Sequence, residues 1–267
     1  MPSSKPESNT PTPAELRPPS AFLLMLEARA FWELGAMVAA TPWLRRLPRG
    51  DGHPVLVFPG MGANDFTTVP LRNFLNGLGY VTQAWGQGFN FGPRDGVLKK
   101  CAADVRALSE RHGQPVSLIG WSLGGIYARE MAKELPQHTR GVITLGTPFT
   151  GHPRATNAWR IFEMLSGQSA DDPAMIERLR TPPPVPTTSI YSRSDGVVNW
   201  QTCCLRPSDT AENIEIYLAS HVGLGVNPAA LWAVADRLAQ GEGHFSQFNR
   251  KGPFAIAYAP LDHAQST

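Results

Sequence analysis

The stretch "VSLIGWSLGGIYARE", Val116–Glu130, decides the fold that we predict for this chain. It opens with a continuous apolar run, which is typical of a strand buried on both faces of a parallel sheet. From Leu123 onward, apolar residues recur at helical spacing. Ser122 lies between the two parts in the pattern Gly-x-Ser-x-Gly, whose glycines permit a sharp strand-to-helix turn that lifts the serine hydroxyl clear of the sheet. The stretch therefore predicts a strand, a strained turn and a helix.

Outside this stretch, short apolar runs alternate with segments of helical periodicity. We predict further strands at residues 53–60, 80–85, 141–149, 188–195 and 214–220, with helices between most of them. Such alternation is typical of an α/β fold. The expected architecture is a mostly parallel central sheet flanked by helices.

Composition shifts divide the chain into four parts. Residues 1–18 are rich in Pro, Ser and Thr and are predicted to form a disordered tail. An apolar helical segment is expected at 19–50, the α/β domain at 51–241 and a C-terminal tail at 242–267. Within the domain, residues 150–186 break the alternation and include most of the stretch "TPPPVPTT" (181–188), so we predict that residues 150–186 form a small cap or lid over the site.

The apolar residues 20–44 leave two interpretations open. Glu27, Arg29 and Glu33 interrupt this segment, which excludes a membrane-spanning helix. The segment forms either a helix packed on the body of the protein or an interfacial anchor with peripheral membrane contact. The start of the chain lacks the layout of a secretory signal, and we therefore expect a cytoplasmic location.

Charge and cysteine content narrow the function classes. The net charge of +2 comes from scattered side chains rather than from a basic stripe, so no nucleic-acid partner is expected. Cys101, Cys203 and Cys204 show no metal-ligand spacing and are predicted to be free thiols, while a redox role for the adjacent pair Cys203 and Cys204 stays open. The sequence indicates neither a metal site nor an oligomeric state.

A serine hydroxyl becomes a good nucleophile when a histidine accepts its proton and a carboxylate orients that histidine. His221 and Asp195 each lie at the end of a predicted strand. Parallel strands deliver such residues to the same edge of the sheet as Ser122. The chain order Ser122, Asp195, His221 is the one expected for a serine on this kind of turn. His152, at the start of the predicted cap, is the main alternative to His221.

Two backbone amides are candidates for an oxyanion hole. The Leu123 amide lies at the start of the predicted helix, where it has no partner within the helix. The loop "VFPGMGAND", residues 57–65, follows the first predicted strand, and Gly60 and Gly62 allow its backbone to turn the Met61 amide toward the same point. We predict that the Met61 and Leu123 amides stabilise an oxyanion together.

Five blocks of the sequence together resemble the α/β-hydrolase superfamily, in particular its bacterial serine esterase and lipase branch. They are "PGMGAND" (59–65), "GWSLGG" (120–125), "LGTPF" (145–149), "YSRSDGVV" (191–198) and "SHVGLG" (220–225). The resemblance covers about residues 50–240. It implies a Ser-Asp-His triad, an acyl-enzyme intermediate, and neither a metal nor an organic cofactor. One departure is Pro59 before Gly60, where many lipases have a histidine.

The sequence thus predicts a serine hydrolase that cleaves carboxylic esters of a small molecule or a lipid. Trp121, Phe66, Trp85 and Phe89 lie on or near loops at the carboxyl edge of the sheet and are predicted to line an apolar pocket. An acyltransferase or a polyester depolymerase would use the same triad. A non-catalytic binding module on the same fold is a further alternative, which the presence of all three triad residues disfavours.

Overall fold

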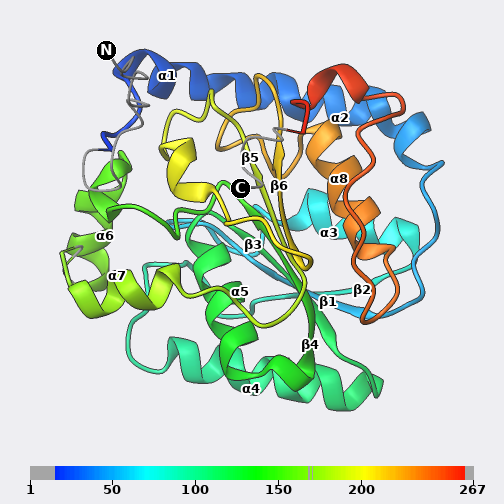
Figure 1. Ribbon diagram of the computed structural model, residues 1–267, viewed down its shortest axis with the longest axis horizontal. Coiled ribbons are helices and arrows are strands. Elements are labelled where there is room, and N and C mark those ends of the chain that lie inside the picture. Colours follow the sequence, from blue (N-terminus) through cyan, green and yellow to red (C-terminus); the bar gives the residue numbers. More distant parts are fainter. Residues whose placement is uncertain (1–15, 168, 170, 262–267) are drawn as a thin grey trace, which may run out of the picture.

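The computed structural model describes residues 16–167, 169 and 171–261. Its centre is a six-stranded sheet with the strand order β2-β1-β3-β4-β5-β6, in which neighbouring strands run parallel (Figure 1). The strands are β1 (Pro54–Phe58), β2 (Val81–Ala84), β3 (Val116–Trp121), β4 (Thr139–Leu145), β5 (Thr187–Tyr191) and β6 (Ala211–Glu215). This arrangement confirms the predicted α/β fold.

Helices cover both faces of the sheet. One core cluster joins the sheet to α2, α3 and α8, and a second joins it to α4 and α5. These helices are α2 (Ala30–Leu44), α3 (Val69–Leu78), α4 (Val97–His112), α5 (Leu123–Glu134) and α8 (Pro228–Leu238). Leu118 and Ile119 of β3 belong to different clusters, and both are fully buried. Successive side chains of a strand point to opposite faces, so a strand covered on both sides is apolar throughout.

The segment before β1 packs on the body of the protein. The short helix α1 (Ala21–Met25), a 3-10 turn (Leu26–Arg29) and α2 follow one another along one edge of the molecule (Figure 1). Leu44 and Leu47 are buried in the core. Among the residues that the structure describes, no helix has both the length and the hydropathy to cross a membrane. The predicted disordered tail lies largely outside the described residues, which begin at 16.

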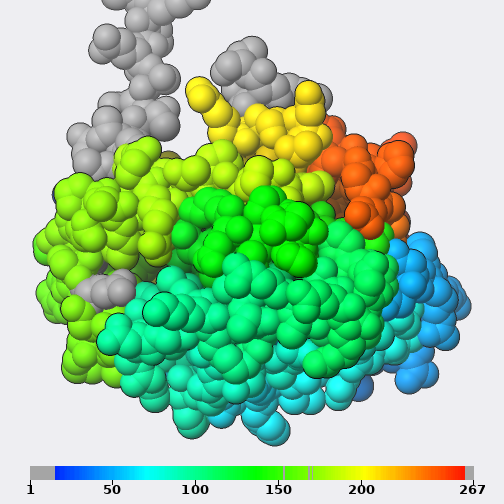
Figure 2. Space-filling model, turned by 90° about the horizontal axis from the view of Figure 1, so that it is seen from below, coloured from blue at the N-terminus to red at the C-terminus, as the bar shows by residue number. Residues whose placement is uncertain are grey.

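Residues between β4 and β5 form the segment that we predicted as a cap. It contains a 3-10 turn (Pro153–Ala155), α6 (Trp159–Ser166) and α7 (Pro173–Arg180). Figure 2 shows the face formed by α4 and α5, with this segment at one end of it. Its helices therefore lie beside α5, which begins directly after Ser122.

The chain after α8 folds back onto the β6 edge of the sheet as far as residue 261. Ile216 forms an isolated bridge with Tyr258. The rings of Phe248 and Tyr258 are buried with their centroids 4.8 Å apart. Part of the predicted C-terminal tail therefore packs on the domain through isolated aromatic residues. The remaining 3-10 turns are Pro136–His138, Trp200–Cys203 and Ala255–Ala257.

Candidate active site

Ser122 lies on a strained turn between β3 and α5. Its backbone has φ 52° and ψ −122°, in the positive-φ region that residues other than glycine rarely adopt. The Ser122 amide donates a hydrogen bond to the Leu145 carbonyl at the end of β4 (2.8 Å). Strain of this kind persists only where the surrounding structure fixes the backbone, and it is concentrated at functional sites. The turn predicted from the sequence is therefore present.

The glycines of the turn are required by close approach of the backbone. A Cβ atom at Gly120 would lie 2.3 Å from the Gly124 carbonyl oxygen, and one at Gly124 would lie 2.3 Å from the Phe58 carbonyl oxygen. A Cβ at Gly125 would lie 2.0 Å from the Thr147 hydroxyl oxygen. The pattern around Ser122 thus allows α5 to start in contact with β1 and β4.

Replacing Gly124 with alanine is expected to lower the free energy of unfolding by at least about 3 kcal/mol, because the new methyl group would meet main-chain atoms at the end of β1. Urea unfolding measures the change. Gly77→Ala in α3 is the matched control, since a Cβ there meets nothing within 4 Å, and we expect a change of less than about 1 kcal/mol in favour of folding. Equal stability of the two variants would contradict the close approach described here.

Asp195 and His221 form a buried pair. The Nδ1 atom of His221 lies 2.6 Å from Oδ2 of Asp195, and the two residues are 6% and 2% exposed. The other carboxylate oxygen of Asp195 accepts hydrogen bonds from the Val197 and Val198 amides (2.8 and 2.7 Å). The acid is therefore held by its own loop, and it fixes the orientation of the imidazole.

The His221–Asp195 pair and the turn that carries Ser122 meet at the end of β4. A Cβ at Gly146 would lie 2.9 Å from His221 Nδ1, and the preceding residue, Leu145, accepts the Ser122 amide. The indole N–H of Trp121 donates to the His221 carbonyl (2.9 Å) and so links the two loops. Within the described part of the chain, no hydrogen bond joins the Ser122 hydroxyl to His221. Such a bond is often long in a ligand-free site and shortens when substrate binds.

The environment of His221 raises its pKa above the ordinary value of 6.5. Burial alone would lower the pKa, but the charge of Asp195, its hydrogen bond and the charge of Glu27 favour the imidazolium and outweigh burial. The site therefore stabilises a positive charge on the histidine, as a general base requires during catalysis.

Glu27 connects the loops that carry Asp195 and His221, a role that was not predicted from the sequence. One of its carboxylate oxygens accepts from the Gly196 amide (2.7 Å) and the His221 amide (3.0 Å). The other accepts from the Val222 amide (2.9 Å). Because Glu27 is buried, these three bonds replace its solvation, and the carboxylate holds both loops at once.

Two neighbouring charged residues act on the same loops. Glu33 accepts from the Ser220 amide and from the Asn227 side chain, both at 2.8 Å. The Arg29 guanidinium donates to the carbonyls of Ser194 (2.6 Å) and Ala219 (2.9 Å). The sequence did contain a signal for these contacts: charged residues inside an apolar segment must find partners when the segment is buried. From the sequence alone, these charges indicated only that the segment does not span a membrane.

The two predicted oxyanion amides lie beside the serine. Met61 and Leu123 both border the cavity next to Ser122, and a Cβ at Gly60 would lie 3.3 Å from the Ser122 Cβ. Neither amide donates to any residue that the structure describes. Backbone amides without a partner at a helix start and a nearby loop are suited to bind a developing negative charge.

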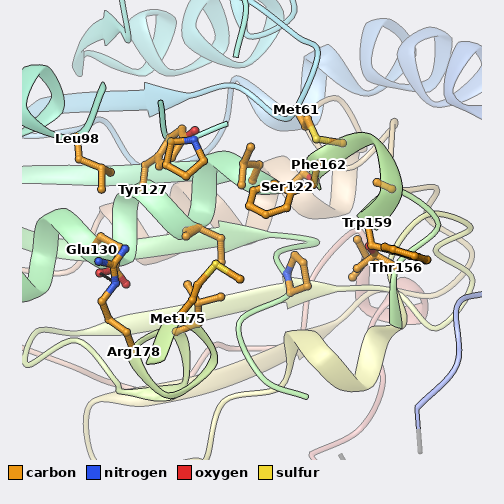
Figure 3. A pocket seen from close by; sticks show the side chains of 17 residues that line it. Met61, Leu98, Ser122, Tyr127, Glu130, Thr156, Trp159, Phe162, Met175 and Arg178 are labelled. Carbon is orange, nitrogen blue, oxygen red and sulfur yellow. Dashed lines mark ion pairs between the residues drawn. The ribbon is translucent and has the colours of Figure 1, made fainter. Parts of the chain in front are cut away.

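The cavity next to Ser122 has a volume of about 110 Å³ and mainly apolar walls. Its lining comes from the loop after β1, from α4 and α5, and from the predicted cap (Figure 3). Representative lining residues are Met61, Leu98, Leu123, Ile126, Phe162 and Met175. Glu130 and Arg178, which form an ion pair at 3.1 Å, lie farther along the cavity. The site can hold an apolar group beside the serine hydroxyl.

The four aromatic residues predicted to line the pocket do not border this cavity, and that prediction was wrong. Trp85 is buried in the core with its ring stacked on Tyr127 at 6.0 Å, and Trp121 contacts the His221 loop. Phe66 and Phe89 are exposed, at 81% and 52%. A place near the edge of the sheet does not determine the direction of a side chain, and α6 and α7 supply pocket residues instead.

The alternative base and the cysteines lie apart from this arrangement. His152 pairs with Asp171 (3.3 Å) on the cap, and both side chains are partly exposed. The three cysteines are free thiols, as predicted. Burial raises the pKa of Cys101 and of Cys204 to about 11, which disfavours the reactive thiolate.

A comparison with known proteins identifies the family to which this architecture belongs. Residues 29–251 match the model of the alpha/beta hydrolase family. The chain belongs to this family. The match includes β1 to β6, Ser122, Asp195 and His221, and it begins two residues after Glu27.

A curated esterase is similar to this α/β hydrolase in sequence, and two solved structures are similar to it in fold. The hydrolase is 28% identical over 152 residues to a pimeloyl-[acyl-carrier protein] methyl ester esterase of Shewanella sp. (strain MR-7). The aligned residues cover 52% of this chain and 54% of the esterase. The hydrolase therefore spans about half the length of that curated relative. The crystal structure of Aspergillus fumigatus lipase B superposes with a TM-score of 0.56 at 18% identity, covering 74% of this chain and 56% of the lipase. An alpha/beta superfamily hydrolase of Oenococcus oeni superposes with a TM-score of 0.50 at 18% identity, covering 68% and 90%.

Proposed function

We propose that this α/β hydrolase cleaves carboxylic esters by nucleophilic catalysis at Ser122. The observation that carries the proposal is the buried pair of His221 and Asp195, joined at 2.6 Å beside a serine on a strained turn. The curated relative named as a methyl ester esterase supports an ester as the reacting group. The family match alone supports the coarser statement that the protein is a hydrolase.

In the proposed mechanism, the Nδ1–H of His221 donates to Asp195, which leaves Nε2 free to accept the Ser122 proton. The serine oxygen attacks the ester carbonyl, and the Met61 and Leu123 amides bind the oxyanion that forms. His221 then gives its proton to the leaving alcohol, and an acyl-enzyme remains. Water, activated by the same histidine, releases the acid and restores the serine.

The apolar cavity supports a substrate with an apolar acyl chain. Esters are favoured over amides because an alcohol leaves more readily than an amine. An acyltransferase would use the same residues and would differ only in the acceptor of the acyl group. A polyester depolymerase would also use them and would differ only in the form of the substrate.

The test is hydrolysis of p-nitrophenyl esters with acyl chains from acetate to palmitate. We expect turnover with a maximum at short or medium chains, because the cavity next to Ser122 has a volume of only about 110 Å³. A maximum at the longest chains would identify a lipase. Failure to hydrolyse any member of the series would contradict simple ester hydrolysis and would favour the transferase, the polymer substrate or the binding module.

The pH dependence of hydrolysis follows from the raised pKa of His221. Only the neutral imidazole accepts the serine proton, so kcat/KM should rise with pH as His221 loses its proton. Because Asp195 and Glu27 outweigh burial, the midpoint of this rise should lie above 6.5. Rates measured from about pH 5 to about pH 9 give the midpoint for the free enzyme. A midpoint at or below 6.5 would contradict this account of the site.

A further inference from the structure

We propose that the outer face of α1 and α2 docks this hydrolase on an anionic lipid surface. The outer face is the set of large exposed apolar side chains on these helices: Phe22, Leu24, Met25, Phe31, Trp32, Leu34, Val38 and Trp43. Phe31 and Trp32 are 81% and 82% exposed. Large aromatic side chains exposed together on one helix mark an interaction surface rather than ordinary surface composition.

The spacing within α2 separates two apolar stripes. Glu33, Ala40 and Leu44 are buried and face the body of the protein. Phe31 and Val38 are seven residues apart and Trp32 and Trp43 are eleven apart, and both spacings return to the same side of a helix, away from the inner stripe. The inner stripe accounts for packing on the core, and the outer stripe has no such role.

The exposed charges of the segment that carries the outer face have one sign. Both acidic residues of the segment, Glu27 and Glu33, are buried and accept hydrogen bonds from the body of the protein. In the described residues from 16 to 50, the exposed charged residues are all arginines: Arg17, Arg45, Arg46 and Arg49. Arg45 and Arg46 continue the outer stripe one turn beyond Pro42 and Trp43. An apolar face bordered by arginines complements a layer of hydrocarbon below anionic headgroups.

The loop before His221 extends the same face. Leu218 is 80% exposed, and its φ of 57° lies in the left-handed region that is unusual for leucine. Arg29 donates to the Leu218 carbonyl (3.2 Å), which places this loop against the α1–α2 segment. Figure 1 shows the segment along the edge of the molecule opposite α4. A lipid surface could therefore contact the helices and this loop at the same time.

Other occupants fit less well. Residues 1–15 and 262–267 contain a single large apolar residue, Met1, and cannot supply an apolar cover. A second copy of the same face would bring arginines together without acidic partners, whereas anionic headgroups neutralise them. Lipid is the occupant that the charges favour.

Vesicle flotation tests the proposal on the full chain. Deletion of residues 1–44 is unsuitable, because it would also remove Glu27 and Glu33 from the loops of Asp195 and His221. We therefore compare the wild type with Phe31→Ser/Trp32→Ser and with Arg45→Ser/Arg46→Ser. Met164→Ser and Arg111→Ser are matched controls, since both positions are exposed and lie on other helices, α6 and α4.

The wild type and both controls should float with phosphatidylcholine vesicles that contain about 30% phosphatidylglycerol. The partition coefficient of the aromatic double variant onto the vesicles should be lower by at least about tenfold. The partition coefficient of the arginine double variant should be lower by about fivefold per arginine, and only on anionic vesicles. All variants should hydrolyse a soluble ester like the wild type, which confirms their fold independently of docking. The proposal is overturned if the wild type does not float, or if the aromatic variant floats equally well. It is also overturned if sedimentation shows that this face instead joins two copies of the chain.

Discussion

Alanine at position 122 should abolish ester hydrolysis, with kcat lower by at least about 10⁴-fold. The variant loses the only oxygen positioned to attack a carbonyl in the proposed mechanism, while the cavity and the His221–Asp195 pair remain. Residual turnover should come from the oxyanion amides and from substrate binding alone. Initial rates on the best p-nitrophenyl ester of the series measure the loss.

The control for this experiment is Ser208→Ala, which alters an exposed serine away from the cavity and should retain full activity. Thermal unfolding should show that Ser122→Ala keeps the folded state, because a hydroxyl is replaced without adding volume. If Ser122→Ala hydrolyses the ester at the wild-type rate, another residue performs the chemistry and the proposed triad is wrong.

Replacing Glu27 with alanine should lower kcat by about 10²-fold or more, although Glu27 is outside the proposed triad. Three amides in the Asp195 and His221 loops would lose their acceptor, and no described group is placed to replace it. Each buried amide left without a partner costs about 1–3 kcal/mol, so the free energy of unfolding should also fall by several kcal/mol. Paired measurements of kcat and of urea unfolding test both expectations.

Glu27→Gln separates a positioning role from a purely structural one. The charge of Glu27 contributes to the raised pKa of His221, so its removal should move the acidic limb of the kcat/KM profile to lower pH. Glu33→Gln is the matched control: Glu33 binds the Ser220 amide and Asn227, and it is not among the causes of the His221 shift. It should reduce stability without moving the limb. Identical pH profiles for Glu27→Gln and the wild type would contradict an electrostatic role for Glu27.

Much of the fold could be predicted because the signals for it are local. Apolar runs marked the buried strands β1, β3 and β4, and the glycines around Ser122 marked the turn. The candidates Asp195 and His221 could be chosen because parallel strands bring their carboxyl ends to one edge of the sheet. The structure joins these two side chains in one hydrogen bond.

The pocket could not be predicted in the same way. Phe66 and Trp85 are close in sequence to the carboxyl ends of strands, yet Phe66 is exposed and Trp85 is buried in the core. Phe162 and Met175, which do line the cavity, belong to helices in the segment where the sequence shows no regular alternation. The lining depends on how this segment lies over α5, and no periodic pattern encodes that placement.

By itself, the sequence determined the succession of strands and helices along the chain. It also determined the strained turn at Ser122 and the residues that a triad would require. Only the tertiary structure decided which side chains face the cavity and which residues hold the catalytic loops. Glu27 contacts amides that lie 169 to 195 positions away along the chain. Periodicity and turn propensity act over a few residues, whereas such contacts arise only when the N-terminal helices pack across the ends of β5 and β6.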